Sequence, residues 1–159
     1  MAEQLKDYKI DAAYTSPILR AKNTAQIILK NHSVLLNEDG RLKEVNFGLL
    51  EGLPCLFVDK LQLESSNWLD DLQMDYTGYE GENVEDVIQR HFELLNDIEK
   101  KFQDDDTILM VGHGCSLYAF VKSLLTKDQE LGMFENASAI IVNKKDSTYT
   151  VEKVLKPEI

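Results

Sequence analysis

The sequence has 159 residues, with 43% hydrophobic and 28% charged side chains and a formal charge of −11, which predicts one globular domain. The negative charge argues against a partner that is nucleic acid or an anionic membrane surface. No apolar run is long enough to cross a bilayer, and residues 1–7 lack the basic start and apolar run of a secretory signal. Cys55 and Cys115 lack metal-type spacing, so we expect a reduced, cytoplasmic protein without a metal or other cofactor.

The N-terminal part of the sequence predicts a helix, a strand and a second helix, in that order. Residues 2–8 are expected to be helical, and residues 10–15 form a short strand candidate. Ser16 and Pro17 follow this strand directly. Serine suits the capping position of a helix and proline its first turn, so the second helix is expected to begin there and to end near Lys30.

The middle of the sequence carries weaker signals. Residues 33–36 predict a second strand, and residues 37–52 predict a loop with polar groups and three glycines. Residues 53–80 are interpreted as a variable insertion with short helices.

The second half returns to regular patterns. From Val84 to Phe102 the apolar residues keep helical spacing, and Asn83 is placed to cap this helix. Residues 107–111 form a continuous apolar run, which is typical of a strand covered on both faces. A further helix is predicted at 116–125, and two late strands are predicted at 139–143 and 148–154.

Strands that alternate with helices predict an α/β fold, in which a sheet carries helices on both faces. We expect a single domain over residues 1–159. In such sheets, ligands bind at the carboxyl ends of the strands. The segments 16–20 and 112–114 each follow a predicted strand, so a site is expected where they meet.

Two side chains in these segments suit phosphate chemistry. His113 lies between two glycines at the end of a buried strand, where an imidazole can bind phosphate or transfer a proton. The alternative is a loop histidine in a turn that glycine permits. Arg20 lies one turn into a helix and can grip two phosphate oxygens, although a solvated helix arginine is the simpler interpretation.

Other candidates come from neighbouring polar groups. Glu44 and Glu51 can each donate a proton to a leaving oxygen, or can be exposed loop carboxylates. Cys115 and Ser116 beside His113 suggest a hydrolase nucleophile, but no Gly-x-Ser-x-Gly or Cys-x5-Arg motif accompanies them. The remaining histidines, at 32 and 91, are expected on the surface.

Together these segments resemble the histidine phosphatase superfamily, whose members are phosphoglycerate mutase-like. Residues 16–25 are similar to the family's Ser-Pro-Leu-x-Arg-Ala-x-x-Thr-Ala block, and residues 42–52 to its Leu-x-Glu…Phe-Gly-x-x-Glu-Gly block. Residues 81–83, which lead into a helix with Arg90, resemble its Gly-Glu-Ser segment, with asparagine in place of serine. Residues 108–114 are similar to the Val-x-His-Gly strand end.

The resemblance implies a three-layer phosphoglycerate mutase-like sheet and a role for each matching residue. Arg20 would grip the phosphate, with Ser16, Gly114 and Cys115 beside it. Glu44 would protonate the leaving alcohol and then activate water, and His113 would stabilise the transferring phosphoryl group. The implied reaction is phosphoryl transfer through a phosphohistidine, with a small phosphorylated substrate or inorganic phosphate as ligand. A short segment between the second and third blocks favours a phosphatase over a mutase.

One family motif has no counterpart. The family opens with a strand that ends in Arg-His-Gly, and its histidine accepts the phosphoryl group; the three histidines here are His32, His91 and His113. We therefore expect the N-terminal strand to be missing, as in a truncated frame, and the 159-residue chain to be inactive. The alternative is a non-catalytic pseudoenzyme that binds phosphorylated ligands or a protein. An exposed sheet edge also predicts a homodimer.

Overall fold

The computed structural model describes residues 1–54, 74–126, 131–132 and 135–157. Its helices are α1 (Ala2–Leu5), α2 (Leu19–Ile28), α4 (Val84–Glu99) and α5 (Gly114–Leu124). Its strands are β1 (Ala12–Thr15), β2 (Leu36–Glu38), β3 (Ile108–Val111), β4 (Ala139–Lys145) and β5 (Thr148–Leu155). Short 3-10 turns lie at Leu29–Asn31, Gly40–Leu42, Gly48–Leu50 and Thr77–Tyr79. None of the helices in these ranges combines the length and apolar character needed to cross a membrane.

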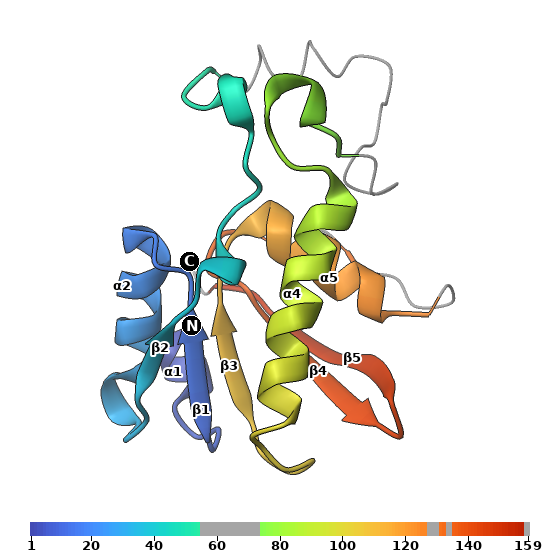
Figure 1. Cartoon of the computed structure of the whole chain (residues 1–159). Helices are drawn as coiled ribbons and strands as arrows, with labels where there is room; N and C mark the ends of the chain where they lie inside the picture. Colours follow the sequence, from blue (N-terminus) through green and yellow to red (C-terminus); the bar gives the residue numbers. More distant parts are fainter. Residues whose placement is uncertain (55–73, 127–130, 133–134, 158–159) are drawn as a thin grey trace.

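Three parallel strands form the main sheet, in the order β2-β1-β3 (Figure 1). Thr15, the last residue of β1, pairs with Glu38 of β2 and with Val111 of β3. The three strands therefore end at the same edge of the sheet, and the segments that follow β1 and β3 begin side by side. This register brings residue 16 close to residue 113 although 97 positions separate them in the sequence.

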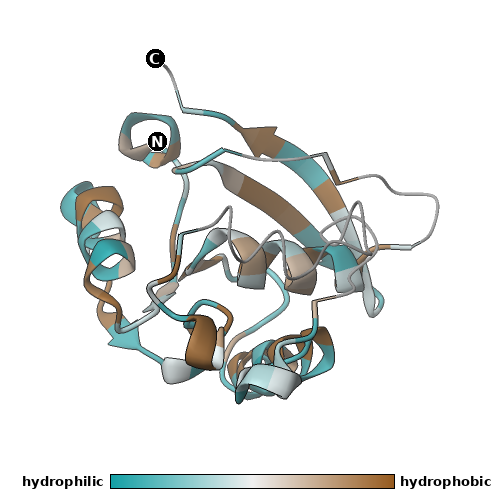
Figure 2. Ribbon diagram, turned by 90° about the horizontal axis from the view of Figure 1, so that it is seen from above, coloured by the Kyte–Doolittle hydropathy of each residue, from teal (hydrophilic) through white to brown (hydrophobic). Residues whose placement is uncertain are grey.

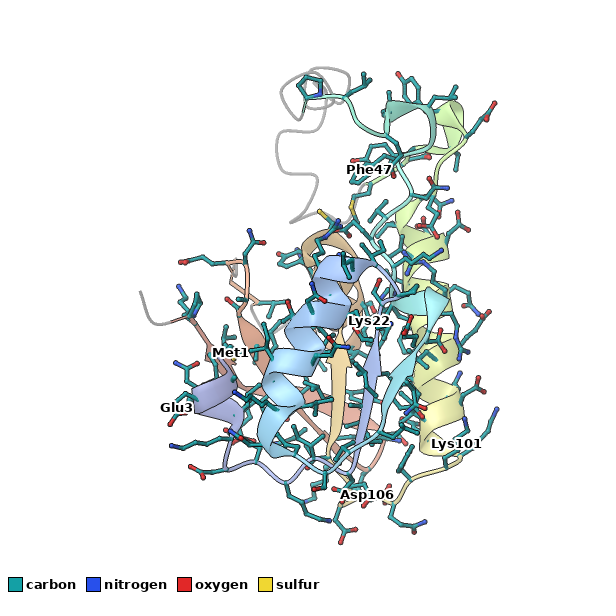
Figure 3. All side chains as sticks on the ribbon, turned by 90° about the vertical axis from the view of Figure 1, so that its left-hand side faces the viewer. Met1, Glu3, Lys22, Phe47, Lys101 and Asp106 are labelled. Atoms are coloured by element: carbon teal, nitrogen blue, oxygen red, sulfur yellow. The ribbon has the colours of Figure 1, made fainter. Side chains whose placement is uncertain are left out.

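Alternate residues of β1 and β3 face two different helix layers. Ala12 and Tyr14 pack in one cluster with Leu94 of α4, whereas Val111 packs with Ala25 of α2 on the other face. The small side chains of α2 let this helix lie close to the sheet. Figure 3, with α2 in front, shows the strands lying between α2 and α4. The predicted three-layer α/β fold is confirmed.

The β4–β5 hairpin is joined to this body by side-chain packing. Seven antiparallel pairs run from Ala139 with Leu155 to Lys145 with Thr148. One side of the hairpin packs with α5, including Phe120, and the other packs with Leu5 of α1 and Ile28 of α2. In Figure 2, seen from above and coloured by hydropathy, stretches of both hairpin strands are apolar. Within the described residues, β3 pairs with β1 alone.

Several boundaries differ from the prediction. The second helix begins at Leu19 rather than at Ser16, because the Ser16 hydroxyl contacts His113 instead of capping a helix. The second strand is Leu36–Glu38 rather than residues 33–36, because its place is set by pairing with β1. The first helix is shorter than predicted and ends at Leu5.

Other predictions are confirmed. Asn83 caps α4 in a capping box with Asp86, with each side chain bonded to the backbone of the other residue. The apolar run before His113 forms β3, and its side chains pack on both faces of the sheet. The two late strands form as a hairpin. The insertion predicted at 53–80 lies mostly outside the described residues.

Candidate active site

A cavity of about 500 Å3 opens where the parallel strands end. Its wall combines three cationic and three anionic side chains with polar backbone and a few apolar groups. The described residues that line it are Ile18, Arg20, Gly40, Lys43, Glu44, Val45, Asn46, Phe47, Glu51, Glu82 and Arg90. Phe47, labelled in Figure 3, lies beyond the ends of the strands and packs edge-on against Tyr76.

Arg20 enters the cavity from the first turn of α2. Its Nε donates a hydrogen bond to Nδ1 of His113 at 3.1 Å. No carboxylate forms an ion pair with Arg20 among the described residues, although both other arginines, Arg41 and Arg90, have one. An arginine of this kind is available to an anionic ligand.

His113 lies directly behind Arg20, at the junction of β3 and α5. It is only 6% exposed, and its Nε2 is 2.9 Å from the Ser16 hydroxyl. Burial and the positive charges of Arg20 and Arg90 lower the pKa of His113, whereas Glu44 opposes this effect. The imidazole is therefore held neutral near pH 7.

Gly112 allows the junction between β3 and α5 to pack closely against its neighbours. A side chain there would meet Leu117 at 3.1 Å and the carbonyl oxygen of Leu42 at 3.2 Å. The strand can thus turn toward α5 while the loop that carries Glu44 lies against it.

Glu44 faces the cavity from this loop and is fixed by backbone donors. Its carboxylate accepts hydrogen bonds from Ser116 N at 2.9 Å, Val45 N at 3.0 Å and Cys115 N at 3.4 Å. Two of these amides belong to the first turn of α5, where the unpaired N–H groups and the helix dipole favour a negative group. The start of α5 therefore sets the orientation of the Glu44 carboxylate.

An arginine on α4 ties the Glu44 loop to the segment before that helix. Arg90 donates to both carboxylate oxygens of Glu82, at 2.9 and 3.2 Å. It also donates to the backbone oxygens of Arg41 and Glu44. Glu82 in turn accepts from the backbone N–H of Asn46 at 2.9 Å. These bonds fix the backbone on both sides of Glu44.

Comparison with known proteins agrees with this arrangement. The profile of the histidine phosphatase superfamily, branch 1, matches residues 1–156. The chain belongs to the histidine phosphatase superfamily. The uncharacterized phosphatase PhoE of Bacillus subtilis is 26% identical over 141 residues, which are 89% of this chain and 67% of that protein.

Two phosphoglycerate mutases are also similar to this chain, one in sequence and one in structure. The 2,3-bisphosphoglycerate-dependent phosphoglycerate mutase of Cytophaga hutchinsonii is 32% identical over 125 residues, or 76% of this chain and 58% of the mutase. The chain thus spans less than two thirds of this relative. The crystal structure of a phosphoglycerate mutase from Bacillus anthracis superposes with a TM-score of 0.78 at 27% identity, covering 95% of this chain and 74% of the mutase.

The predicted histidine phosphatase residues occupy three depths. Arg20 and Glu44 line the cavity. His113 lies behind Arg20, and Ser16 is fully buried behind His113, so the Ser16 hydroxyl has no access to a ligand in this conformation. Gly114 and Cys115 form the start of α5. The backbone N–H of Cys115 donates to Glu44, which lines the cavity.

The two alternative nucleophile candidates, Ser116 and Cys115, lie in the first turn of α5. The hydroxyl of Ser116 is buried and donates to the backbone oxygen of His113, not to its imidazole. Cys115 is half-buried and packs against the cluster that contains Val84 and Ala119. The Ser116 hydroxyl is therefore not paired with the imidazole of a histidine base.

Sequence reasoning gave no role to Glu82 and Arg90, which both line the cavity. The two residues are eight positions apart, about two helical turns, and Glu82 directly precedes the capping residue of α4. This spacing is the signal that could have paired them. Lys43, Asn46 and Phe47 were also part of a recognised motif, but their contribution to the wall depends on the path of the loop.

Proposed function

We propose that this cavity binds the phosphoryl group of a small phosphomonoester, or inorganic phosphate. The observation that carries the proposal is the presence of Arg20 and Glu44 on one cavity wall. A guanidinium suits the charged phosphoryl oxygens, and a carboxyl group suits proton transfer to and from the ester oxygen. Membership of the histidine phosphatase superfamily supports the same chemistry.

For a complete domain that also carries the family's Arg-His-Gly histidine, the proposed reaction is hydrolysis through a phosphohistidine on that residue. The bond between phosphorus and the ester oxygen breaks as a bond to a histidine nitrogen forms, and Glu44 gives its proton to the departing alcohol. Water then attacks phosphorus while Glu44 takes a proton from it, the bond between phosphorus and the histidine nitrogen breaks, and inorganic phosphate leaves. Arg20 stabilises the phosphoryl oxygens with His113 hydrogen-bonded behind it, and the start of α5 at Gly114 and Cys115 adds its dipole.

We further propose that the 159-residue chain by itself binds phosphate without appreciable turnover. The acceptor histidine of the family belongs to an Arg-His-Gly motif, which these 159 residues do not contain. His113 is the histidine at the site, and both its ring nitrogens are engaged, one by Arg20 and one by Ser16. Neither nitrogen is available to attack phosphorus in this arrangement.

Hydrolysis is proposed rather than mutase transfer because the segment between Gly52 and Gly81 is short. The curated relatives include a protein named as a phosphatase and a protein named as a mutase, so both reactions occur among proteins similar to this chain. A non-catalytic role in binding phosphorylated ligands is the competing proposal, and the neutral, fully engaged His113 favours it for the isolated chain.

Calorimetry with inorganic phosphate and vanadate, together with an aryl phosphate assay, tests these proposals on the purified, mass-verified chain. We expect phosphate binding that Arg20→Ala weakens about 30-fold, because a charge-assisted pair of hydrogen bonds is lost. Arg41→Ala is the matched control, since Arg41 pairs with Asp39 and Asp97 and its side chain does not line the cavity. Absence of binding would refute the site, and ordinary phosphatase turnover would refute the proposed inactivity.

We also propose that the chain forms a homodimer through the edge of β3 and has neither nucleic acid nor a membrane as partner. In the described part of the chain, β3 has a strand partner on one side only, and an open strand edge is a template for pairing. Sedimentation velocity over a range of concentrations should show a monomer–dimer equilibrium. A single monomeric species at every concentration would exclude the dimer.

A further inference from the structure

Three side chains from separate parts of the chain form a line that leads from the core to the cavity. Ser16 follows β1, His113 follows β3, and Arg20 lies on α2. The Ser16 hydroxyl is 2.9 Å from Nε2 of His113, and Nδ1 of His113 is 3.1 Å from Nε of Arg20. The innermost two are 0% and 6% exposed, respectively.

The hydrogen bond between Arg20 and His113 determines which ring nitrogen of His113 carries the proton. A guanidinium has N–H donors and no acceptor, so Nδ1 of His113 must offer its lone pair to Arg20. The neutral imidazole then carries its proton on Nε2, which donates to the Ser16 hydroxyl oxygen. That oxygen also accepts from the backbone N–H of Ile18 at 3.3 Å, which uses its second lone pair. The bonds are mutually consistent for one protonation state only.

The surrounding charges agree with this state. Arg20 on α2 and Arg90 on α4 disfavour a second proton on His113, and Glu44 on the loop is the one anionic group that favours it. Burial acts in the same direction as the two arginines and is the largest cause of the lowered pKa of His113.

The consequence falls on Arg20, whose long side chain is otherwise solvent-exposed. One of its five N–H donors is used by His113, which fixes the plane of the guanidinium. The four N–H groups on Nη1 and Nη2 remain for a ligand in the cavity. A guanidinium whose orientation is already fixed loses less conformational freedom on binding an anion than a freely rotating guanidinium does.

We propose that Ser16 and neutral His113 are positioning residues for Arg20: Ser16 selects the Nε2-protonated tautomer, and that tautomer holds the guanidinium in a phosphate-binding orientation. This inference rests on the proposed function, in which Arg20 is the phosphate ligand. It assigns Ser16 an effect on binding that is exerted through two hydrogen bonds and not by contact with the ligand.

Nitrogen-15 NMR of histidine-labelled protein at pH 7.5 tests the tautomer directly, since the chain has only three histidines. His113 should show a protonated Nε2 and an unprotonated Nδ1. His91 supplies an internal reference of the opposite kind, because its Nδ1 must donate to the carbonyl oxygen of Val87 at 2.8 Å. A protonated Nδ1 on His113, in either the neutral or the charged form, overturns the proposal even where a variant fails to fold.

Binding of inorganic phosphate tests the consequence. Ser16→Ala should weaken binding about fivefold, the equivalent of one hydrogen bond, and should give His113 a mixture of tautomers. Ser123→Ala is the matched control, since that serine lies on α5 and donates only to the carbonyl oxygen of Phe120. In an Arg20→Ala background, Ser16→Ala should have no further effect on affinity, because the residue through which it acts is gone.

The outcomes separate this inference from the proposed function. Phosphate binding that Ser16→Ala leaves unchanged, with Arg20→Ala still harmful, refutes the positioning role and leaves the phosphate site standing. Equal losses from Ser16→Ala with and without Arg20 show a merely structural effect and also refute it. If the unaltered chain binds no phosphate, the proposed function fails, and the tautomer of His113 still decides whether the hydrogen-bonded line exists.

Discussion

Two histidines are buried in the described part of the chain, one at the end of β3 and the other in the middle of α4. His113 has a partner on each ring nitrogen, from Ser16 and Arg20. His91 donates from Nδ1 to Val87, but its Nε2 is buried without a hydrogen-bond partner among the described residues. Its ring instead stacks on Phe120 at 5.1 Å between centroids.

The two environments separate a histidine that organises a site from one that fills a core. At His113 the polar partners lead outward to the cavity, so the imidazole has an effect on Arg20. At His91 the described contacts are the carbonyl oxygen of Val87 and the ring of Phe120, neither of which lines the cavity, and burial lowers the pKa of His91 to about 4. Burial and a shifted pKa alone therefore do not identify a functional histidine here; the hydrogen-bond partners do.

Arg90 is the one charge that acts on both histidines, so its removal gives the largest expected effect. Arg90→Gln breaks the pair with Glu82 and the bonds to the Glu44 loop, and should lower the free energy of unfolding by about 2–3 kcal/mol. The pKa values of His91 and His113 should both rise, since Arg90 lowers each of them. Urea unfolding and NMR titration measure the two effects.

Arg41→Gln is the matched control for this change. Arg41 also pairs with carboxylates, but it lies nearer the surface and outside the cavity wall. We expect a smaller loss, of about 1 kcal/mol, because Arg41 is more exposed than Arg90, with both histidine pKa values unchanged. Equal losses in the two variants would show that the bonds of Arg90 to the Glu44 loop add nothing to stability.

The pH dependence of the free energy of unfolding measures the effect of His91 separately from that of His113. Unfolded histidine binds a proton near pH 6.5, whereas His91 in the fold does so only at about pH 4. The part of the free energy of unfolding that depends on neutral His91 is therefore fully present above about pH 6.5. It is lost as the pH falls toward 4. Between pH 7 and pH 5 the loss should be about 2 kcal/mol. Urea unfolding of His91→Phe should show that much less dependence on pH; an unchanged dependence would place the effect on other groups.

Part of this contrast could be predicted from the sequence. His113 was placed at the site because two segments that each follow a strand must meet at one edge of a parallel sheet, and this expectation needed no tertiary detail. His91 was predicted on the surface, which is wrong, since it is 0% exposed. Its position four residues after Val87 and three before Leu94 puts it on the buried stripe of α4.

The errors in the strands and helices have a different origin. Local signals were sufficient for α4, where a capping box and a helical period agree, and for the β4–β5 hairpin. They failed at β2, whose bounds depend on register with β1. They also failed at Ser16, whose hydroxyl is drawn away from capping by a residue 97 positions later. Such choices depend on tertiary contacts that no local pattern contains.

The smallest expected effect comes from the ring that covers His91. Phe120 stacks on His91 and also packs edge-on against Phe92 at 5.5 Å. Phe120→Leu keeps an apolar side chain but removes both aromatic contacts, so the free energy of unfolding should fall by about 1 kcal/mol. Phosphate affinity should remain unchanged, because nothing polar connects this core to Arg20. A several-fold loss of phosphate affinity in a folded Phe120→Leu protein would mean that the two histidine environments are coupled through α5, and the separation drawn between them would fail.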